Sequence, residues 1–291
     1  KGEIDYLSKL IRPNIALITN ISYAHIENFE NLGQIAKAKS EIIDNIIPGG
    51  TMIINKDDKY YNYFFKKAKN RNLKIISFSK KDRNADIVYL NQKQYKKKYI
   101  INFKVYNKKK SFLISKNLLN YKENILASLS IIVSYFEIEN LNKNLFLNFS
   151  IPKSRGSIIL HNKTSNKLTI IDESYNSNPL SLKFALEKFD HEFKSNKKFL
   201  LIGNMLELGK YSKKLHIKIA KYINKSKVNK VYVYGNQVKH TYNKLKPQIR
   251  GKILNNYMDI LNLINKELPN NSFLMVKGSN STGLNKIVQN L

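Results

Sequence analysis

Two spacings of hydrophobic residues alternate along the first part of the chain. Short apolar runs bounded by polar residues predict strands, and apolar residues three or four positions apart predict helices between them. The predicted strands are residues 15–19, 52–54 and 73–78, and the predicted helices are residues 34–47 and 60–70. This order is typical of a parallel sheet whose crossovers are helices.

The pattern changes to short alternating segments between residues 85 and 115, which predicts a small antiparallel part before a helix at residues 123–136. Pro152, followed by the polar run Lys153-Ser154-Arg155-Gly156, marks the best boundary between two domains. Strands are then predicted at residues 168–172, 199–203, 231–235 and 273–277, each followed by a helical stretch. The fold class expected is α/β, with a mostly parallel sheet in the first domain and a doubly wound sheet in the second.

Composition narrows the class of protein. With 291 residues, 42% of them hydrophobic, the chain is long enough for about two packed domains. The absence of cysteine excludes a disulfide scaffold, a thiolate metal site and a cysteine nucleophile. The longest apolar stretch, residues 125–138, is shorter than the roughly 18 residues of a membrane span. We therefore expect a cytoplasmic protein, and the initial Lys1 suggests a piece of a longer chain.

A net charge of +30 raises the question of a polyanionic partner. The basic residues are mostly lysines spread over the whole length, a distribution that an AT-rich coding sequence also produces. The densest runs, residues 96–98 and 108–110, flank an apolar alternation and are interpreted as the solvated ends of a hairpin. No nucleic-acid-binding motif accompanies them, so we expect no nucleic-acid partner.

Lys39 occupies an unusual position in the predicted helix 34–47. Apolar residues at helical spacing place Lys39 in the middle of the apolar stripe, whereas Lys37 points to the polar side. Burial lowers the pKa of a lysine, and a neutral amine can react with carbon dioxide to form a carbamate that binds a metal. On the residues alone, the alternative is a lysine whose ammonium group reaches solvent at the edge of the core.

Polar residues also follow several predicted strands, where α/β proteins place ligand sites. His25 comes after the first strand, and residues 172–179 (Asp-Glu-Ser-Tyr-Asn-Ser-Asn-Pro) lie between a strand and a helix. Residues 203–209 and Lys277-Gly278-Ser279 occupy the same position on other strands, so three loops are expected to form a pocket. The alternatives are a packing histidine and a helix cap. Neither Gly-x-Gly-x-x-Gly nor a complete phosphate-binding loop motif occurs.

Seven segments, in order along the chain, resemble motifs of the Mur ligases. They are Gly2-Glu3-Ile4, Arg12-Pro13, residues 20–29, residues 35–42, residues 172–179, residues 205–209 and Lys277-Gly278-Ser279. The resemblance covers essentially the whole chain. It is greatest to the type that adds D-alanyl-D-alanine to UDP-N-acetylmuramoyl-tripeptide in peptidoglycan precursor synthesis.

The resemblance implies an incomplete central ATPase domain at residues 1–151, lacking the phosphate loop, and a Rossmann-like C-terminal domain at residues 152–291. Such a piece would be inactive alone. The implied reaction uses ATP to convert the tripeptide carboxylate into an acyl phosphate, which the amine of D-alanyl-D-alanine attacks. The implied cofactors are ATP and Mg²⁺, the implied partners are the two substrates, and the protein is expected to be a monomer.

Site residues are implied by position in the motifs. His25 and a carbamylated Lys39 would bind magnesium, and with Glu173 they are the implied catalytic residues. Asn124 would lie near the nucleotide base, and Arg155 and Glu173 near the ATP phosphates. The substrate-binding residues would be Ser174, Tyr175, Asn176, Asn178, Lys277 and Ser279.

The chain departs from the motifs of the Mur ligases at one pair of residues and at two single positions. Asn120-Tyr121 replaces a common His-Asn pair, Asn204 replaces a common Asp, and Asn280 replaces a common Arg. The competing interpretations are a sister ligase that adds a single amino acid, and a basic nucleic-acid-binding protein on a degenerate ligase scaffold.

Overall fold

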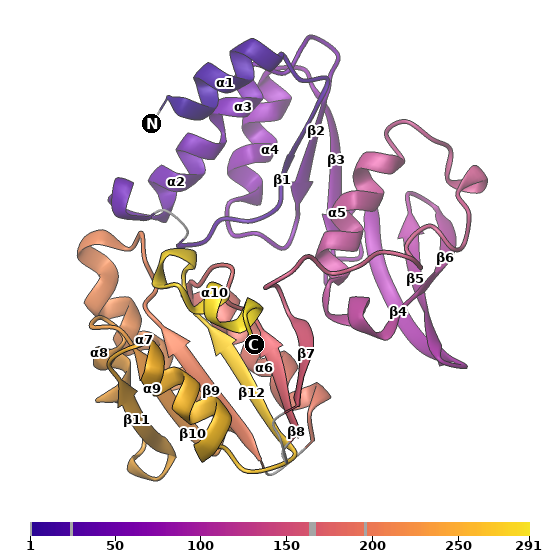
Figure 1. Ribbon diagram of the computed structural model, residues 1–291. Coiled ribbons are helices and arrows are strands. Elements are labelled where there is room, and N and C mark those ends of the chain that lie inside the picture. The colour runs from indigo at the N-terminus through magenta and orange to yellow at the C-terminus, as the bar shows by residue number, and fades with distance from the viewer. Residues whose placement is uncertain (1, 24–25, 163–166, 195–196) are drawn as a thin grey trace. The chain divides into compact units, whose positions relative to one another are not determined.

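The computed structural model describes residues 2–23, 26–162, 167–194 and 197–291 (Figure 1). Their contacts divide the chain into two compact units. The first comprises Lys1–Ser22 and Asn31–Ser150, and the second comprises Tyr23–Glu30 and Ile151–Leu291.

The first unit is built on a six-stranded sheet in the order β1-β2-β3-β4-β5-β6. The strands are β1 (Ile15–Ile18), β2 (Thr51–Asn55), β3 (Lys74–Ser79), β4 (Ile87–Tyr95), β5 (Lys98–Val105) and β6 (Lys108–Ile114). Pairing is parallel from β1 to β4 and antiparallel from β4 to β6. The change of pattern at residue 85 therefore marks a real change from parallel to antiparallel pairing.

Helices cover both faces of the parallel part (Figure 1). They are α1 (Glu3–Ile11), α2 (Leu32–Lys39), α3 (Glu41–Asp44), α4 (Tyr61–Asn70) and α5 (Lys122–Ile132). Met52 and Ile54 of β2 pack with Phe64 of α4, whereas Ile53 points to the opposite face, where α5 contacts the sheet. Burial of β2 at all five positions follows from this double covering.

The helix predicted at residues 34–47 is divided in two at Ser40. The Ser40 side chain is fully buried, and its hydroxyl donates to the Lys37 carbonyl at 2.7 Å. The Ser40 carbonyl accepts from the Ile43 amide, three residues on, and from Lys67 Nζ at 3.0 Å. The tighter turn and the additional donors replace the α-helical pairing there, so α2 ends at Lys39.

The second unit also has a six-stranded sheet, in the order β11-β10-β9-β12-β8-β7. The strands are β7 (Ser157–Asn162), β8 (Lys167–Asp172), β9 (Lys198–Gly203), β10 (Lys230–Tyr234), β11 (Arg250–Leu254) and β12 (Ser272–Lys277). Every pair is parallel except β7 with β8. The expectation of a doubly wound sheet is confirmed, although the sequence pattern did not predict β7 or β11.

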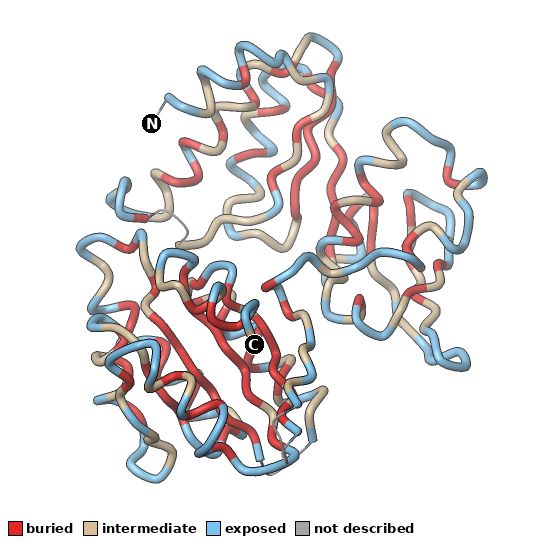
Figure 2. Tube along the Cα trace, viewed as in Figure 1, coloured by how far each residue is buried: buried red, intermediate tan, exposed pale blue. Residues whose placement is uncertain are grey.

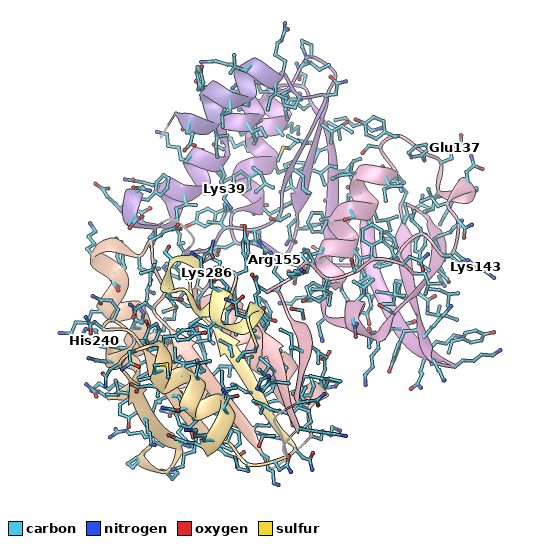
Figure 3. The ribbon with its side chains drawn as sticks, in the orientation of Figure 1. Lys39, Glu137, Lys143, Arg155, His240 and Lys286 are labelled. Carbon is cyan, nitrogen blue, oxygen red and sulfur yellow. The ribbon has the colours of Figure 1, made fainter. Side chains whose placement is uncertain are left out.

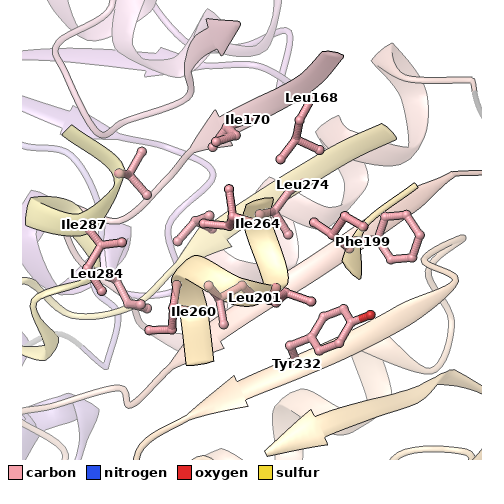
Figure 4. Close-up of a cluster of buried hydrophobic side chains, with 14 of the residues drawn as sticks. Leu168, Ile170, Phe199, Leu201, Tyr232, Ile260, Ile264, Leu274, Leu284 and Ile287 are labelled. Atoms are coloured by element: carbon pink, nitrogen blue, oxygen red, sulfur yellow. The ribbon is translucent and has the colours of Figure 1, made fainter. Parts of the chain in front are cut away.

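Helices α6 (Pro179–Glu192), α7 (Ser212–Ile223) and α8 (Lys239–Tyr242) cover one face of this sheet. On the other face, α9 (Tyr257–Asn262), a π-helical turn (Leu263–Glu267) and α10 (Leu284–Gln289) enclose a core (Figure 4). Leu201 of β9 and Leu274 of β12 lie in that core with Ile260 and Leu284. Figure 2 shows the resulting buried central strands. Among the described helices, none has both the length and the hydropathy needed to cross a bilayer.

Candidate functional site

Lys39 ends α2, with Ala38 buried beside it and Lys37 exposed, as the helical spacing predicted. Lys39 is half-buried (Figure 3), and its Nζ donates to the Asn20 carbonyl at 3.0 Å, just beyond the end of β1. Burial lowers the pKa of Lys39 below the ordinary lysine value, although the nearby charge of Asp58 acts in the opposite direction. The amine is thus held where a larger than usual fraction is neutral and able to react.

The loops around Lys39 are tied together by Asp58, which follows β2. One carboxylate oxygen accepts from the Ile21 amide at 2.7 Å and the other from the Tyr60 amide at 2.8 Å. The bond from Ile21 joins the loop after β1 to the loop after β2, and the bond from Tyr60 fixes the carboxylate within its own loop. Asp58 carried no signal in the sequence pattern, because its role depends on which strands are neighbours.

Two further predicted residues, His25 and Asn124, add little to the geometry of the site. His25 lies outside the described residues. Asn124 is exposed in the first turn of α5, next to Glu123, which pairs with Lys80 at 2.6 Å after β3. Within the described part of the chain, no three His, Cys, Asp or Glu side chains gather closely enough to hold a metal ion. Lys39 is therefore the described residue that could, as a carbamate, supply one ligand.

In the second unit, the three loops expected to form a pocket do come together at one edge of the sheet. The Glu173 amide donates to the Val276 carbonyl at 2.9 Å, and the Ser279 amide donates to the Asn204 carbonyl at 3.0 Å. Ser279 Oγ accepts from the Leu206 amide at 2.9 Å. The strand order brings this about, because β12 lies between β8 and β9.

Lys277 and Glu173 form the charged centre of these loops. The Lys277 side chain is 2% exposed and its Nζ donates to the Asn176 carbonyl at 3.0 Å, while Glu173 Oε2 lies 3.9 Å away. Burial raises the pKa of Glu173 and lowers the pKa of Lys277, and in each case the partner's charge opposes the shift. A carboxyl group with a raised pKa and an amine with a lowered pKa are moved toward each other, which is typical of groups that exchange protons at functional sites.

Asp172, the last residue of β8, fixes the start of the loop at residues 172–179 through hydrogen bonds. It is 1% exposed and accepts from Ser154 Oγ at 2.8 Å, from the Ser174 amide at 3.0 Å and from the Ser174 hydroxyl. The Ser174 side chain is thereby turned inward. Asp172 was not among the predicted site residues, although an acid at the end of a buried strand is a usable signal.

The remaining predicted residues of the 172–179 segment differ in their surroundings. Tyr175 is exposed, and the Arg155 guanidinium (Figure 3) lies 4.1 Å from the centre of its ring. Asn178 Oδ1 accepts from the Ser181 amide at 2.9 Å, and Ser181 Oγ accepts from the Asn178 amide at 3.0 Å. Asn178 therefore caps α6 in a reciprocal capping box, the alternative that the sequence left open.

A pocket of about 390 Å³ opens at the same edge of the sheet, beside these loops. It is lined by Asn204, Leu206, Tyr234, Gly235, Asn236, Lys239, Leu254, Asn255, Ser281 and Thr282. Tyr234 and Leu254 end β10 and β11, and the other lining residues follow β9, β10, β11 or β12, so four parallel strands end at the pocket. Among the described lining residues Lys239 alone is charged, which favours an anionic ligand group.

Comparison with known proteins bears on both units. The family model of the Mur ligase middle domain matches residues 1–132, and that of the Mur ligase, glutamate ligase domain, matches residues 159–280. The chain belongs to the Mur ligase family.

Named relatives are UDP-N-acetylmuramoyl-tripeptide--D-alanyl-D-alanine ligases. This Mur ligase chain is 32% identical to that of Rickettsia prowazekii, over 99% of its own length and 63% of the relative's, and 31% identical to that of Buchnera aphidicola from Acyrthosiphon pisum, over 100% and 62%. It thus spans about three fifths of these relatives.

Solved Mur ligase structures share the fold. MurF from Acinetobacter baumannii superposes with a TM-score of 0.83 at 22% identity, covering 100% of this chain and 62% of that one. MurF from Thermotoga maritima, in complex with ADP, gives 0.77 at 21% identity, covering 99% and 64%. These likenesses show that the two units share the fold of the solved Mur ligases.

Proposed function

We propose that this chain forms the catalytic middle and C-terminal parts of an ATP-dependent ligase that joins D-alanyl-D-alanine to UDP-N-acetylmuramoyl-tripeptide. The observation that carries the proposal is the 32% identity, over 99% of the chain, to a relative named for that reaction. The geometry of the loops after β8, β9 and β12 is consistent with it, because they present a buried amine and a buried carboxyl group at the edge of the sheet.

The proposed reaction has two steps. The γ-phosphoryl group of ATP is transferred to an oxygen of the tripeptide carboxylate, which gives ADP and an acyl phosphate. The amine nitrogen of the dipeptide then attacks the carbonyl carbon, the bond from that carbon to the phosphate oxygen breaks, and inorganic phosphate leaves as the amine loses a proton. The products are an amide, ADP and phosphate.

We assign the proton of the attacking amine to Glu173. Its raised pKa makes it a better proton acceptor than an ordinary glutamate, and Lys277 stabilises its charged form. Asn176 and Ser279, whose side chains face each other at 3.5 Å, would line the path of the substrate together with Tyr175, whereas Ser174, predicted to do so, is buried and turned onto Asp172. Arg155 and Asn124 would contact the phosphates and the base of ATP.

Magnesium ions would neutralise the charge that develops on the transferred phosphoryl group. Lys39 as a carbamate and His25 are the ligands we propose. Burial lowers the pKa of Lys39, which supports carbamate formation because only the neutral amine reacts with carbon dioxide.

The pocket beside the three loops would receive the incoming dipeptide. Its volume of about 390 Å³ lies within the usual range for small-molecule sites, and Lys239 could pair with a terminal carboxylate. Backbone and side-chain amides of Asn204, Asn236 and Asn255 supply further polar groups around it.

Phosphate release by the full-length protein tests this proposal. We expect release only when ATP, Mg²⁺, UDP-N-acetylmuramoyl-tripeptide and D-alanyl-D-alanine are all present. Release that is indifferent to the dipeptide would contradict the proposal. Release that requires a single amino acid in place of the dipeptide would assign the chain to a sister ligase.

A further inference from the structure

Hydrogen bonds to the side chains of His216 and Ser279 hold the loop after β9, residues 205–211. The Met205 amide donates to Nε2 of the buried His216 at 3.1 Å, and the Leu206 amide donates to Ser279 Oγ at 2.9 Å. Within the loop, Glu207 has a φ of 60°, a left-handed conformation that is unfavourable for a residue with a Cβ atom. Such conformations persist where the surroundings hold them, often at sites that clamp another group.

The same loop also contacts residues 26–30, which belong by their contacts to the second unit. The Glu27 amide donates to the Glu207 carbonyl at 3.1 Å, and the Tyr211 hydroxyl donates to the Glu30 carbonyl. Ile26 is 1% exposed. Two backbone groups of the short segment are therefore paired with the loop, and its first described side chain is buried.

Gly209 allows the closest approach between them. Its φ is 48°, and a Cβ atom at this position would lie 2.9 Å from both Cα and Cβ of Glu27. Contacts of that length with backbone do not occur in folded proteins, so any larger residue at 209 must push residues 26–30 away. The proposed function places Leu206 at the pocket but gives Gly209 no role, and this contact gives residue 209 a structural one.

We propose that the 205–211 loop is a clamp that positions residues 26–30, with Gly209 as the residue that permits the contact. The clamped segment follows His25 directly in the sequence. The clamp therefore restrains the backbone next to a proposed magnesium ligand, and this consequence rests on the proposed function. Gly209 is a positioning residue, because it touches no reacting group.

Hydrogen exchange tests the clamp in the full-length protein, independently of activity. In Gly209→Ala we expect the amides of residues 26–30 to exchange about tenfold faster than in the unaltered protein, because local opening becomes easier. Gly49→Ala is the matched control. Gly49 has a φ of 76° with no atom within 4 Å of its added Cβ, so this change introduces the same backbone strain without a clash.

A second variant covers the possibility that Gly209→Ala does not fold. Tyr211→Phe removes the hydroxyl bonded to Glu30 and should increase exchange over residues 26–30 in the same direction. Unchanged exchange in every folded variant would overturn the clamp, whether or not the protein proves to be a ligase.

The positioning role has its own readout. We expect the half-saturating Mg²⁺ concentration of the ligase reaction to rise about tenfold in Gly209→Ala, the usual effect of losing support around a metal ligand. The KM for the dipeptide should stay unchanged. A faster exchange with an unaltered Mg²⁺ requirement would overturn the positioning role and leave a purely structural contact.

Discussion

Lys39 and Lys37 lie two residues apart on α2 but in different surroundings. Lys37 is exposed, whereas Lys39 is half-buried, bonded to the Asn20 carbonyl and lowered in pKa by burial. We expect Lys39→Ala to reduce kcat of the full-length ligase by about 100-fold or more, since loss of an ordering group around a metal alone costs 10–100-fold.

Lys37→Ala is the control for this prediction and should retain the activity of the unaltered protein. Addition of a short carboxylic acid to Lys39→Ala should restore part of the rate, because a carboxylate can replace a carbamate. Full activity in Lys39→Ala would instead make Lys39 a lysine at the edge of the core with no chemical role.

His216 provides a prediction about pH. It is fully buried, its Nδ1 lies 2.9 Å from the Ser212 carbonyl, and its Nε2 accepts from Met205, so the neutral form satisfies both nitrogens. Burial lowers the pKa of His216 in the folded protein, although the hydrogen bond to Ser212 opposes this. The unfolded chain therefore binds a proton first as the pH falls below about 6.5.

The free energy of unfolding should consequently fall as the pH drops from about 7 to about 5, because the unfolded state binds more protons than the folded state. Urea unfolding followed by circular dichroism at several pH values measures this. In His216→Gln the decrease over the same range should be smaller. An identical pH dependence in both proteins would show that His216 does not contribute.

Asn178 lies between β8 and α6, and it is the N-cap residue of α6. Because it caps α6 reciprocally with Ser181, Asn178→Ala should lower the free energy of unfolding by about 1 kcal/mol. Urea unfolding checks this value. If the cap is its whole function, kcat/KM for the dipeptide stays unchanged, whereas a substrate contact would raise KM as well.

Lys239 begins α8 at the end of β10, and it tests the use of the pocket. We expect Lys239→Gln to raise the KM for D-alanyl-D-alanine by about tenfold and to leave the KM for ATP unchanged, since a hydrogen bond to a charged group contributes about 1.5 to 3 kcal/mol. Lys286→Gln, on α10 and outside the residues that line the pocket, is a control. An unaltered KM for the dipeptide in Lys239→Gln would place the substrate elsewhere.

The net charge of +30 is a property of the whole molecule. Part of the dense lysine run at 108–110 is already engaged, because Lys108 pairs with Glu139 and Lys110 Nζ donates to the Glu139 carbonyl at 3.0 Å. Residues 96–98 lie at the exposed turn between β4 and β5, as expected for a solvated hairpin end.

We therefore expect only weak, sequence-independent binding to DNA, with a Kd no tighter than about 10⁻⁶ M at physiological salt and a steep loss on adding salt. Filter binding at two salt concentrations measures both properties. Tight, sequence-selective binding at physiological salt would favour the nucleic-acid-binding interpretation over the ligase.

Local sequence determined the parallel strands of this protein better than its helices, since the predicted helix 34–47 is divided at Ser40 and the predicted helix 123–136 ends at Ile132. Strands 15–19, 73–78, 168–172 and 231–235 were each predicted to within one or two residues of β1, β3, β8 and β10, because buried parallel strands appear as short apolar runs. The helical spacing also predicted that Lys39 is more buried than Lys37. The edge strands β7 and β11 were missed because an edge strand is only partly buried and its pattern is correspondingly weak.

The tertiary structure alone decided which strand ends are neighbours. The placement of β12 between β8 and β9 brings Lys277 against Glu173 and Asn176. These residues are 104 and 101 positions away from Lys277 in the sequence. The same holds for Asp58 against the Ile21 amide and for Gly209 against Glu27. Hydrophobic periodicity is a local property and fixes each element by its own burial, whereas strand order depends on contacts between segments far apart in the chain, and pKa shifts depend on the burial that those contacts create.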